Sequence, residues 1–268
     1  MQDSNQMEKT PKYPVKTIIK AIEIINYLAQ DTSNTGIGVS EFSRMLNMGK
    51  STVHRILETL QTYGYIEKDE TLNQYRLGWE LYKIGQAIPR QNQLLNLSPS
   101  HMAKLSKTTR ETVSLAILNR NETVIISKIE GSYDGLRVNL NPGEYESTHA
   151  TALGKVLICE KDELTLRELF KGKIVLPEYT PNTIVNIADL LIEKERVSKQ
   201  GYAEDIEEYC NGVHCIAMPV RDYTQQIIAA VSVSTPVGRM DAEKRSLILE
   251  ALSQCTKEIS RNLGYSVV

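Results

Sequence analysis

The sequence predicts an α+β fold in two parts joined by a helix. Apolar residues recur with helical spacing through residues 15–63, whereas strand-like runs joined by tight turns dominate after residue 110. Between them, residues 79–97 show a helical pattern interrupted by Pro89. We therefore expect a first domain at 14–78, a linker helix at 79–97 and a second domain at 98–268.

The first domain should begin with a helix over residues 15–29. Its apolar residues are spaced as one helical stripe, which consists of Val15, Ile18, Ile19, Ile22, Ile25 and Leu28. Two short helices are predicted at 40–47 and 50–63, with the turn Asn-Met-Gly-Lys between them. Residues 65–77 then read as a β-hairpin around a polar turn.

The second domain should alternate helices with antiparallel strands. Helices are predicted at 99–110, 148–160, 163–170, 184–200 and 241–263. Strands are predicted at 112–119, 123–131, 136–140, 201–208, 212–220 and 227–234. Strand pairs joined by tight turns imply an antiparallel sheet.

Composition excludes several classes of protein. Of 268 residues, 41% are hydrophobic and 24% charged, which is the balance of an ordinary globular chain and not of a disordered one. No apolar run approaches the ~18 residues of a membrane span, and the polar start is not a secretory signal. Four cysteines are too few for a disulfide framework, so we expect a cytoplasmic protein with reduced thiols and no membrane partner.

The net charge of −2 gives no signal for nucleic acid, so a DNA-binding interpretation depends on a motif. Residues 39–65 supply one, because two short helices joined by a tight turn are typical of a helix-turn-helix. In the second helix Val53, Ile56, Leu57 and Leu60 face the core. The outward residues are short, polar or cationic, as a recognition helix requires: Lys50, Ser51, Thr52, His54 and Arg55.

In this hypothesis Arg55 and Ser51 contact bases, and Lys50 contacts phosphate. The hairpin would be the wing of a winged helix, with Arg76 near a phosphate or the minor groove. The alternative is a plain helical hairpin with a solvated face.

The motif is specific enough to show a resemblance. GKSTVHRIL, followed by GYI and YRLG, resembles the DNA-binding half of the isocitrate lyase regulator (IclR) family of bacterial transcription factors. HATALGKVLI, GYAEDIEE and GVHCIAMPVRD resemble its effector domain in the same order, so the similarity extends from about Pro14 to Leu263. One departure is Gly49, where many members carry proline.

The resemblance implies a GAF-like C-terminal domain that binds small organic or sugar acids, and a homodimer or tetramer that acts as repressor or activator. It also implies effector contacts at six positions: Ala152, Leu153, Asp205, Cys215, Ser232 and Ser234. Independently, two serines at alternate positions of an apolar strand need hydrogen-bond partners, either backbone groups or a polar ligand.

Two further features could bind an acid group. Ser147 or Thr148 is expected to cap the helix that follows, and the free backbone N–H groups at the start of that helix would suit a carboxylate. Arg137 is either a counter-ion for such a carboxylate or an exposed surface arginine.

Two rival sites use the same region. Cys210, His214, Cys215 and His149 could form a metal site, but the spacing is not that of a zinc site, because adjacent strand residues point to opposite faces. A Cys215 nucleophile paired with His149 would need an orienting group and an oxyanion hole, and no nucleophile signature is present. We therefore expect no catalytic residue, no metal and no cofactor.

The sequence thus predicts a ligand-responsive transcriptional regulator, with repression expected, and not an enzyme. It should bind a palindromic operator in double-stranded DNA as an oligomer and respond to a small, carboxylate-bearing metabolite. The alternative is a small-molecule enzyme fused to a DNA-binding module, which turnover of the metabolite would reveal. A protein–protein adaptor, in contrast, would show no salt-dependent DNA binding.

Overall fold

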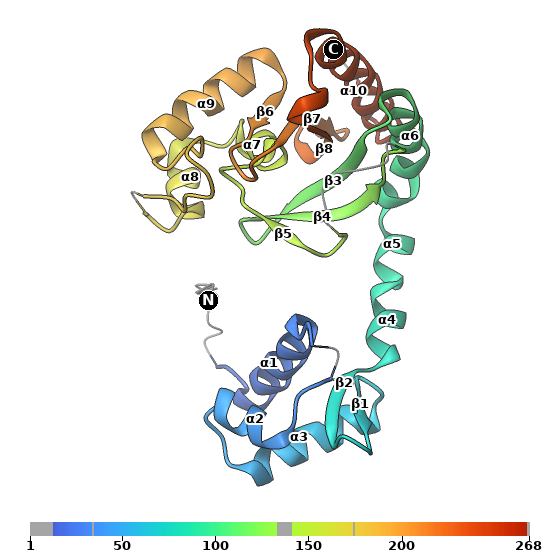
Figure 1. Cartoon of the computed structure of the whole chain (residues 1–268), viewed down its shortest axis with the longest axis vertical. Helices are drawn as coiled ribbons and strands as arrows, with labels where there is room; N and C mark the ends of the chain where they lie inside the picture. Colours follow the sequence, from blue (N-terminus) through green and yellow to red (C-terminus); the bar gives the residue numbers. More distant parts are fainter. Residues whose placement is uncertain (1–12, 34, 133–140, 174, 267–268) are drawn as a thin grey trace. The chain divides into compact units, whose positions relative to one another are not determined.

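The computed structural model of the chain describes residues 13–33, 35–132, 141–173 and 175–266 (Figure 1). Its internal contacts divide the chain into two units, Met1–Gln91 and Asn92–Val268. The fold class predicted from the sequence is confirmed: a helix-turn-helix with a hairpin comes first, and an α+β domain on an antiparallel sheet follows.

The first unit is built on helices and one hairpin. Its elements in the described residues are α1 (Lys16–Gln30), α2 (Val39–Met45), α3 (Lys50–Thr62), β1 (Ile66–Asp69), β2 (Gln74–Leu77), α4 (Trp79–Gly85) and α5 (Ala87–Gln91). Helix α3 starts after Gly49, whose φ of −61° is also the value that a proline ring imposes. The departure from the family pattern at this position therefore leaves the start of the recognition helix intact.

The core of this unit corrects the predicted stripe of α1. Ile24 and Leu28 are buried, whereas Val15, Ile18 and Ile22 are more than half exposed. Helix α1 thus carries two apolar stripes that share Leu28, and the predicted one is otherwise exposed at Val15, Ile18 and Ile22 and half-buried at Ile19 and Ile25. Packing against α3 and β2 decides which stripe is covered.

The linker region also differs from the prediction of one helix over 79–97. Helices α4 and α5 are separate, and Pro89 lies in the first turn of α5, where a missing N–H costs nothing. The next helix, α6 (Gln93–Thr109), begins six residues before the predicted start at Pro99 and contains that proline. Its start is fixed by Asn92, whose side chain accepts hydrogen bonds from the backbone N–H groups of Leu94 and Leu95.

The second unit contains the antiparallel sheet. After α6, its described elements are β3 (Thr112–Asn119), β4 (Glu122–Ile129), β5 (Tyr145–Glu146), α7 (Ala152–Ile158), α8 (Glu163–Leu169), α9 (Ile187–Gln200), β6 (Ala203–Ile206), β7 (Val213–Arg221), β8 (Ile227–Pro236) and α10 (Ala242–Asn262), with a 3-10 turn at Val237–Arg239. The predicted strand at 136–140 lies outside the described residues. Strand β5 lies in a segment for which the sequence predicts neither helix nor strand.

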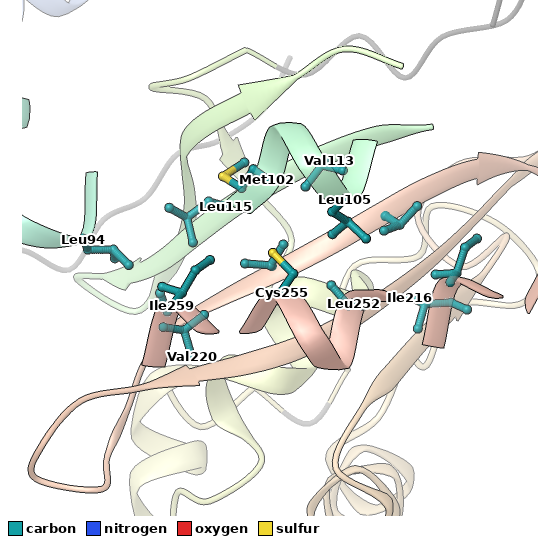
Figure 2. Close-up of a cluster of buried hydrophobic side chains, with 14 residues drawn as sticks. Leu94, Met102, Leu105, Val113, Leu115, Ile216, Val220, Leu252, Cys255 and Ile259 are labelled. Atoms are coloured by element: carbon teal, nitrogen blue, oxygen red, sulfur yellow. The ribbon is translucent and has the colours of Figure 1, made fainter. Parts of the chain in front are cut away.

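The sheet has the order β5-β4-β3-β8-β7-β6, with antiparallel neighbours throughout. Alternation of side chains gives it two different faces. One face carries the apolar residues that pack against α6 and α10, including Val113, Leu115 and Val220 (Figure 2). The other face packs against α7 through small residues such as Ala217 and Ala230. The small residues leave room over this face.

Helix α7 is capped differently from the prediction. The N-cap is Thr151, whose side chain accepts a hydrogen bond from Gly154 N at 3.1 Å, and not Ser147 or Thr148. Those two side chains bond elsewhere, Ser147 to His149 and Thr148 to Thr123. A Cβ at Gly154 would lie 2.3 Å from the carbonyl oxygen of Thr148, so only glycine lets the helix approach this backbone.

Candidate DNA-binding surface and effector cavity

The α2–α3 pair has the form that the sequence predicted. Its tight turn includes Asn47 in the left-handed region (φ 51°), and the hydroxyl of Ser43 donates to the carbonyl of Met48. Val53, Ile56 and Leu57 anchor α3 in the core. The opposite side of α3 therefore faces solvent along its N-terminal half.

All five candidate residues of this helix are exposed. They are Lys50, Ser51, Thr52, His54 and Arg55. In the part of the chain that the structure describes, none of their side chains forms an ion pair or hydrogen bond with another residue. A surface of short polar and cationic side chains without internal partners is well suited to phosphates and base edges.

The hairpin carries the sixth candidate. Arg76 on β2 lies 3.5 Å from the Asp69 carboxylate on β1, and its side chain is 53% exposed. Such an exposed ion pair contributes little stability, so it does not prevent Arg76 from binding a phosphate.

Apolar side chains gather on the exposed sides of α1 and α4–α5. On α1 and the residue before it they are Val15, Ile18 and Ile22, and on α4–α5 they are Trp79, Tyr82, Ile84 and Ile88. The linker segment has apolar residues at helical spacing, and of these Ile84 and Ile88 are exposed and Leu81 is half-buried. So many large exposed apolar side chains on a small unit are typical of a surface that a partner covers.

In the second unit, the α7 face of the sheet lines a cavity. Strand register places Asp205, Cys215 and Ser234 side by side in one row across β6, β7 and β8. A neighbouring row contains Ser232 on β8 and Ser114 on β3. Adjacent residues in such rows share a face, so these polar groups converge below α7.

The cavity has about 390 Å³ of empty space, part of it open to solvent. All six described effector candidates line it: Ala152, Leu153, Asp205, Cys215, Ser232 and Ser234. The seventh, Arg137, lies outside the described residues. A small cavity with apolar walls and a few convergent polar groups is the usual form of a small-molecule site.

Other lining residues were not predicted from the sequence: Ser114, Glu146, Thr151, Tyr209, Cys210 and Val213. Ser114 had a detectable signal, because Thr112 and Ser114 alternate in an otherwise apolar strand as Ser232 and Ser234 do. Glu146 had no such signal in the sequence, since it lies in a polar segment without a helical or strand pattern.

Two carboxyl groups face this cavity. Burial raises the pKa of Glu146 to about 8, and the nearby carboxyl groups of Asp205 and Glu144 add to the increase. Burial also raises the pKa of Asp205 to about 6, although hydrogen bonds from the backbone N–H groups of Glu208 and Tyr209 oppose this. At neutral pH Glu146 therefore keeps its proton, while Asp205 is largely ionised.

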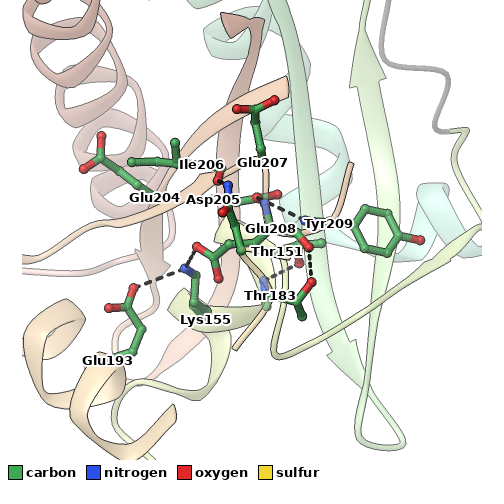
Figure 3. Close-up of polar contacts among 12 residues, drawn as sticks. Thr151, Lys155, Thr183, Glu193, Glu204, Asp205, Ile206, Glu207, Glu208 and Tyr209 are labelled. Carbon is green, nitrogen blue, oxygen red and sulfur yellow. Dashed lines mark hydrogen bonds and ion pairs between the residues drawn. The ribbon is translucent and has the colours of Figure 1, made fainter. Parts of the chain in front are cut away.

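The segment after β6 is held in place by buried polar contacts (Figure 3). The Lys155 ammonium lies 2.5 Å from Glu208 and 3.2 Å from Glu193. The hydroxyl of Thr183 donates to the carbonyl of Glu208 at 2.6 Å. These bonds connect α7 and α9 to the Asp205 side of the cavity, which is thereby preorganised.

The rival sites do not form from the predicted residues. His214 points to the face opposite Cys215 and lies 3.2 Å from Glu204. His149 bonds to Ser147 and to the carbonyl of Pro177, not to Cys215. Burial raises the pKa of the Cys215 thiol well above its usual range, and this thiol donates to Ser234, so it is protonated and a poor nucleophile. Among the described residues no cluster of three or more His, Cys, Asp or Glu side chains is placed to hold a metal.

No helix in the described residues has the length and apolarity needed to cross a membrane.

Comparison with known proteins agrees with this architecture. Residues 17–70 match the IclR helix-turn-helix domain, and residues 86–261 match the C-terminal domain of bacterial IclR transcriptional regulators. The regulator XynR of Escherichia coli (strain K12) is 33% identical over 94% of this chain and 98% of its own length. KdgR of the same strain is 32% identical over 97% of this chain and 96% of its own. The repressor AllR of Salmonella typhi is 31% identical, with 97% and 94% covered.

Solved structures are similar over both units. IclR of Thermotoga maritima superposes with a TM-score of 0.75 at 30% identity, covering 94% of this chain and all of that one. An IclR homologue from Microbacterium hydrocarbonoxydans, solved as a complex with 4-hydroxybenzoate, has a TM-score of 0.78 at 20% identity, with 93% of this chain and 100% of that chain covered. The relatives are named as regulators of transcription and not as enzymes. This chain therefore belongs to the IclR family of bacterial transcriptional regulators.

Proposed function

We propose that this regulator is a repressor that leaves its operator when a small organic acid fills the cavity beneath α7. The observation that carries the proposal is the convergence of six predicted effector residues on one cavity. Two further findings support it: relatives such as AllR are named as repressors, and a homologue of this fold was solved with an aromatic acid.

The DNA-binding residues in this proposal are those exposed on α3, with Arg76 on the hairpin. Arg55 and Ser51 read base edges, and Lys50 with Arg76 binds phosphates. The exposure of these side chains favours this assignment, as does the absence, among the described residues, of ion pairs from those of α3. The operator is double-stranded DNA with palindromic half-sites about 34 Å apart, or a multiple of that distance.

A palindrome requires a symmetric oligomer, a homodimer or a pair of dimers. We propose that the apolar side chains of α1 and α4–α5 form the contact between copies of the first unit. One winged helix offers too few contacts for selective binding at physiological salt, so pairing adds the second half-site. The effector would change the spacing of the two recognition helices through the chain connection between α5 and α6. All of this takes place in the cytoplasm, where the thiols stay reduced.

The effector contacts follow from the register of the sheet. Ser232 and Ser234 would donate hydrogen bonds to the acid group, with the backbone of Ala152 and Leu153 beside them. Leu153 and the protonated thiol of Cys215 would set the shape of the cavity. Asp205 is largely ionised at neutral pH, so it would bind a hydroxyl of the effector and not its acid group.

Fluorescence anisotropy with DNA from the flanks of the protein's own gene tests the proposal. We expect selective binding, and the logarithm of the association constant should fall linearly with the logarithm of the salt concentration. A thermal-shift screen of organic and sugar acids should then identify acids that stabilise the protein, by about 2.7 kcal/mol at a hundredfold excess over the Kd. Those acids should also release the DNA. Salt-independent binding, or stabilising acids that leave the complex unchanged, would contradict the proposal.

A further inference from the structure

One carboxyl group of the cavity has an unexplained position. Glu146 on β5 is only 7% exposed, and its Oε2 is buried without a hydrogen-bond partner among the described residues. The same side chain lines the cavity. A buried polar atom without a protein partner lowers the stability of a protein unless a water, an ion or a ligand supplies the missing bond, and the position of Glu146 on the cavity wall makes a ligand able to do so.

The neighbourhood of Glu146 restricts what that ligand group can be. Asp205 faces the same cavity, and its Oδ1 is occupied by the backbone N–H groups of Glu208 and Tyr209. Two acidic side chains that line one cavity and interact electrostatically disfavour an anionic group beside them. An acid group of the effector must therefore lie away from them.

Hydroxyl groups fit this part of the cavity. A protonated carboxyl group offers one donor and one acceptor, and an ionised one offers acceptors, so the pair Glu146 and Asp205 can bind hydroxyls that both donate and accept. The remaining polar lining consists largely of hydroxyl-bearing residues, with Ser114, Ser232 and Ser234 among them. A cationic effector group is the main competitor, because it would also be attracted to Asp205.

Resting on the proposed effector function, we infer that Glu146 determines effector specificity. The effector is then a polyhydroxylated carboxylic acid whose hydroxyl-bearing end lies against Glu146 and Asp205. An acid with a plain alkyl chain would leave the buried Glu146 carboxyl group without a partner.

Five six-carbon acids, which share one carboxylate and differ in the rest of the molecule, test this inference. Gluconate and its epimer galactonate carry hydroxyl groups along the chain. Hexanoate carries no further polar group, 6-aminohexanoate carries a terminal ammonium, and adipate carries a second carboxylate. Calorimetry on the full-length protein should show that gluconate or galactonate binds at least about tenfold more tightly than the other three, because only these satisfy the buried carboxyl group.

Variants of Glu146 then show whether this residue is responsible. Glu146→Leu should lose roughly 10–100-fold in affinity for the hydroxylated acid and bind hexanoate more tightly than the wild type does. Glu146→Gln keeps one donor and one acceptor, so it should stay within about threefold of the wild type. The matched control is Glu195→Leu, at a position on α9 that is 71% exposed, and it should change neither affinity. Thermal unfolding of each variant checks that it is folded.

The outcomes separate this inference from the proposed function. Tighter binding of hexanoate, 6-aminohexanoate or adipate than of both hydroxylated acids would overturn the hydroxyl assignment, but an acid that releases DNA would still support an effector site. Unchanged gluconate or galactonate affinity in Glu146→Leu would overturn the role of Glu146. Binding of none of the acids would overturn the inference, while the anisotropy experiment would still report DNA binding independently.

Discussion

Glu146 and Asp205 lie on the two edge strands of a six-stranded sheet, β5 and β6, and yet line the same cavity. The sheet therefore curls so that its edges approach a common space beneath α7. The carboxyl group of Asp205 contributes to the raised pKa of Glu146, so the two groups also interact electrostatically. The two carboxyl groups thus make part of this cavity acidic.

The first prediction concerns stability against pH in the absence of effector. The pKa of Glu146 is about 8 in the folded chain, against 4.5 for the free side chain. Its folded state therefore binds more protons between these values, and the contribution of Glu146 to stability is lost as the pH rises from about 4.5 through about 8. Glu146→Gln removes this ionisation.

Chemical denaturation of wild type and Glu146→Gln at a series of pH values provides the measurement. Between pH 5 and pH 9 the unfolding free energy of the wild type should fall, relative to that of Glu146→Gln, by at least about 1 kcal/mol. This corresponds to about 2–4 °C in Tm. Glu195→Gln, on the exposed side of α9, is the control. A pH-independent difference would show that Glu146 is already ionised at pH 5 or is more solvated than its position indicates.

The second prediction concerns the serine row. The Cys215 thiol donates to the Ser234 hydroxyl at 3.2 Å, so Ser234 already has one side-chain partner across the strand pair. Ser234→Ala should leave an effector atom unpaired and reduce effector affinity by about 1–3 kcal/mol, with DNA affinity unchanged. Ser232→Ala should act in the same direction, and Ser100→Ala on the exposed side of α6 is the control.

Calorimetry with an acid from the stabilising screen, together with an operator shift assay, checks this. If both Ser232→Ala and Ser234→Ala retain the wild-type affinity, the effector lies elsewhere and the serines serve only the sheet.

The third prediction concerns the recognition helix. Arg55→Ala should weaken operator binding by about 1–3 kcal/mol and relax sequence preference, because a base contact is lost. Lys50→Ala should weaken operator and non-specific DNA alike and reduce the salt slope by about one, as expected for a lost phosphate contact. Lys199→Ala, on α9 with an 81% exposed side chain, is the control for charge alone. An Arg55→Ala protein that is as selective as the wild type would show that another face reads the bases.

The fourth prediction concerns assembly through α1 and α4–α5. Ile22 and Ile88 are 52% and 62% exposed, so their replacement by glutamate should leave each folded unit intact. If copies of the chain pair through this surface, Ile22→Glu and Ile88→Glu should weaken the oligomer by burying unpaired charge, and operator affinity should fall with it. The matched control is Ile192→Glu on α9, where the isoleucine is 69% exposed.

Light scattering at micromolar concentration measures the outcome. The wild type should be at least a dimer. A wild-type monomer, or an Ile22→Glu protein that still pairs and binds the operator normally, would place the contact between copies on another surface.

The sequence alone determined the local structure and the class of the protein. Helical spacing from Val53 to Leu60 placed the polar side of α3 outward, because the period of a helix fixes which residues share a face. Alternation in β8 likewise put Ser232 and Ser234 on one face. Both patterns depend on residues close in sequence, and the family resemblance added the positions that share their cavity.

Only the tertiary structure decided what depends on distant packing. Helix α1 has two apolar stripes, and spacing cannot tell that Ile24 is buried while Ile18 is exposed. The start of α6 at Gln93 depends on the cap at Asn92, which overrides the break expected at Pro99. Glu146 and Asp205 are far apart in sequence, and only the curl of the sheet brings both to one cavity. Strand pairing and curvature are properties of the assembled sheet, so no local pattern around Glu146 could reveal that it shares a cavity with Asp205.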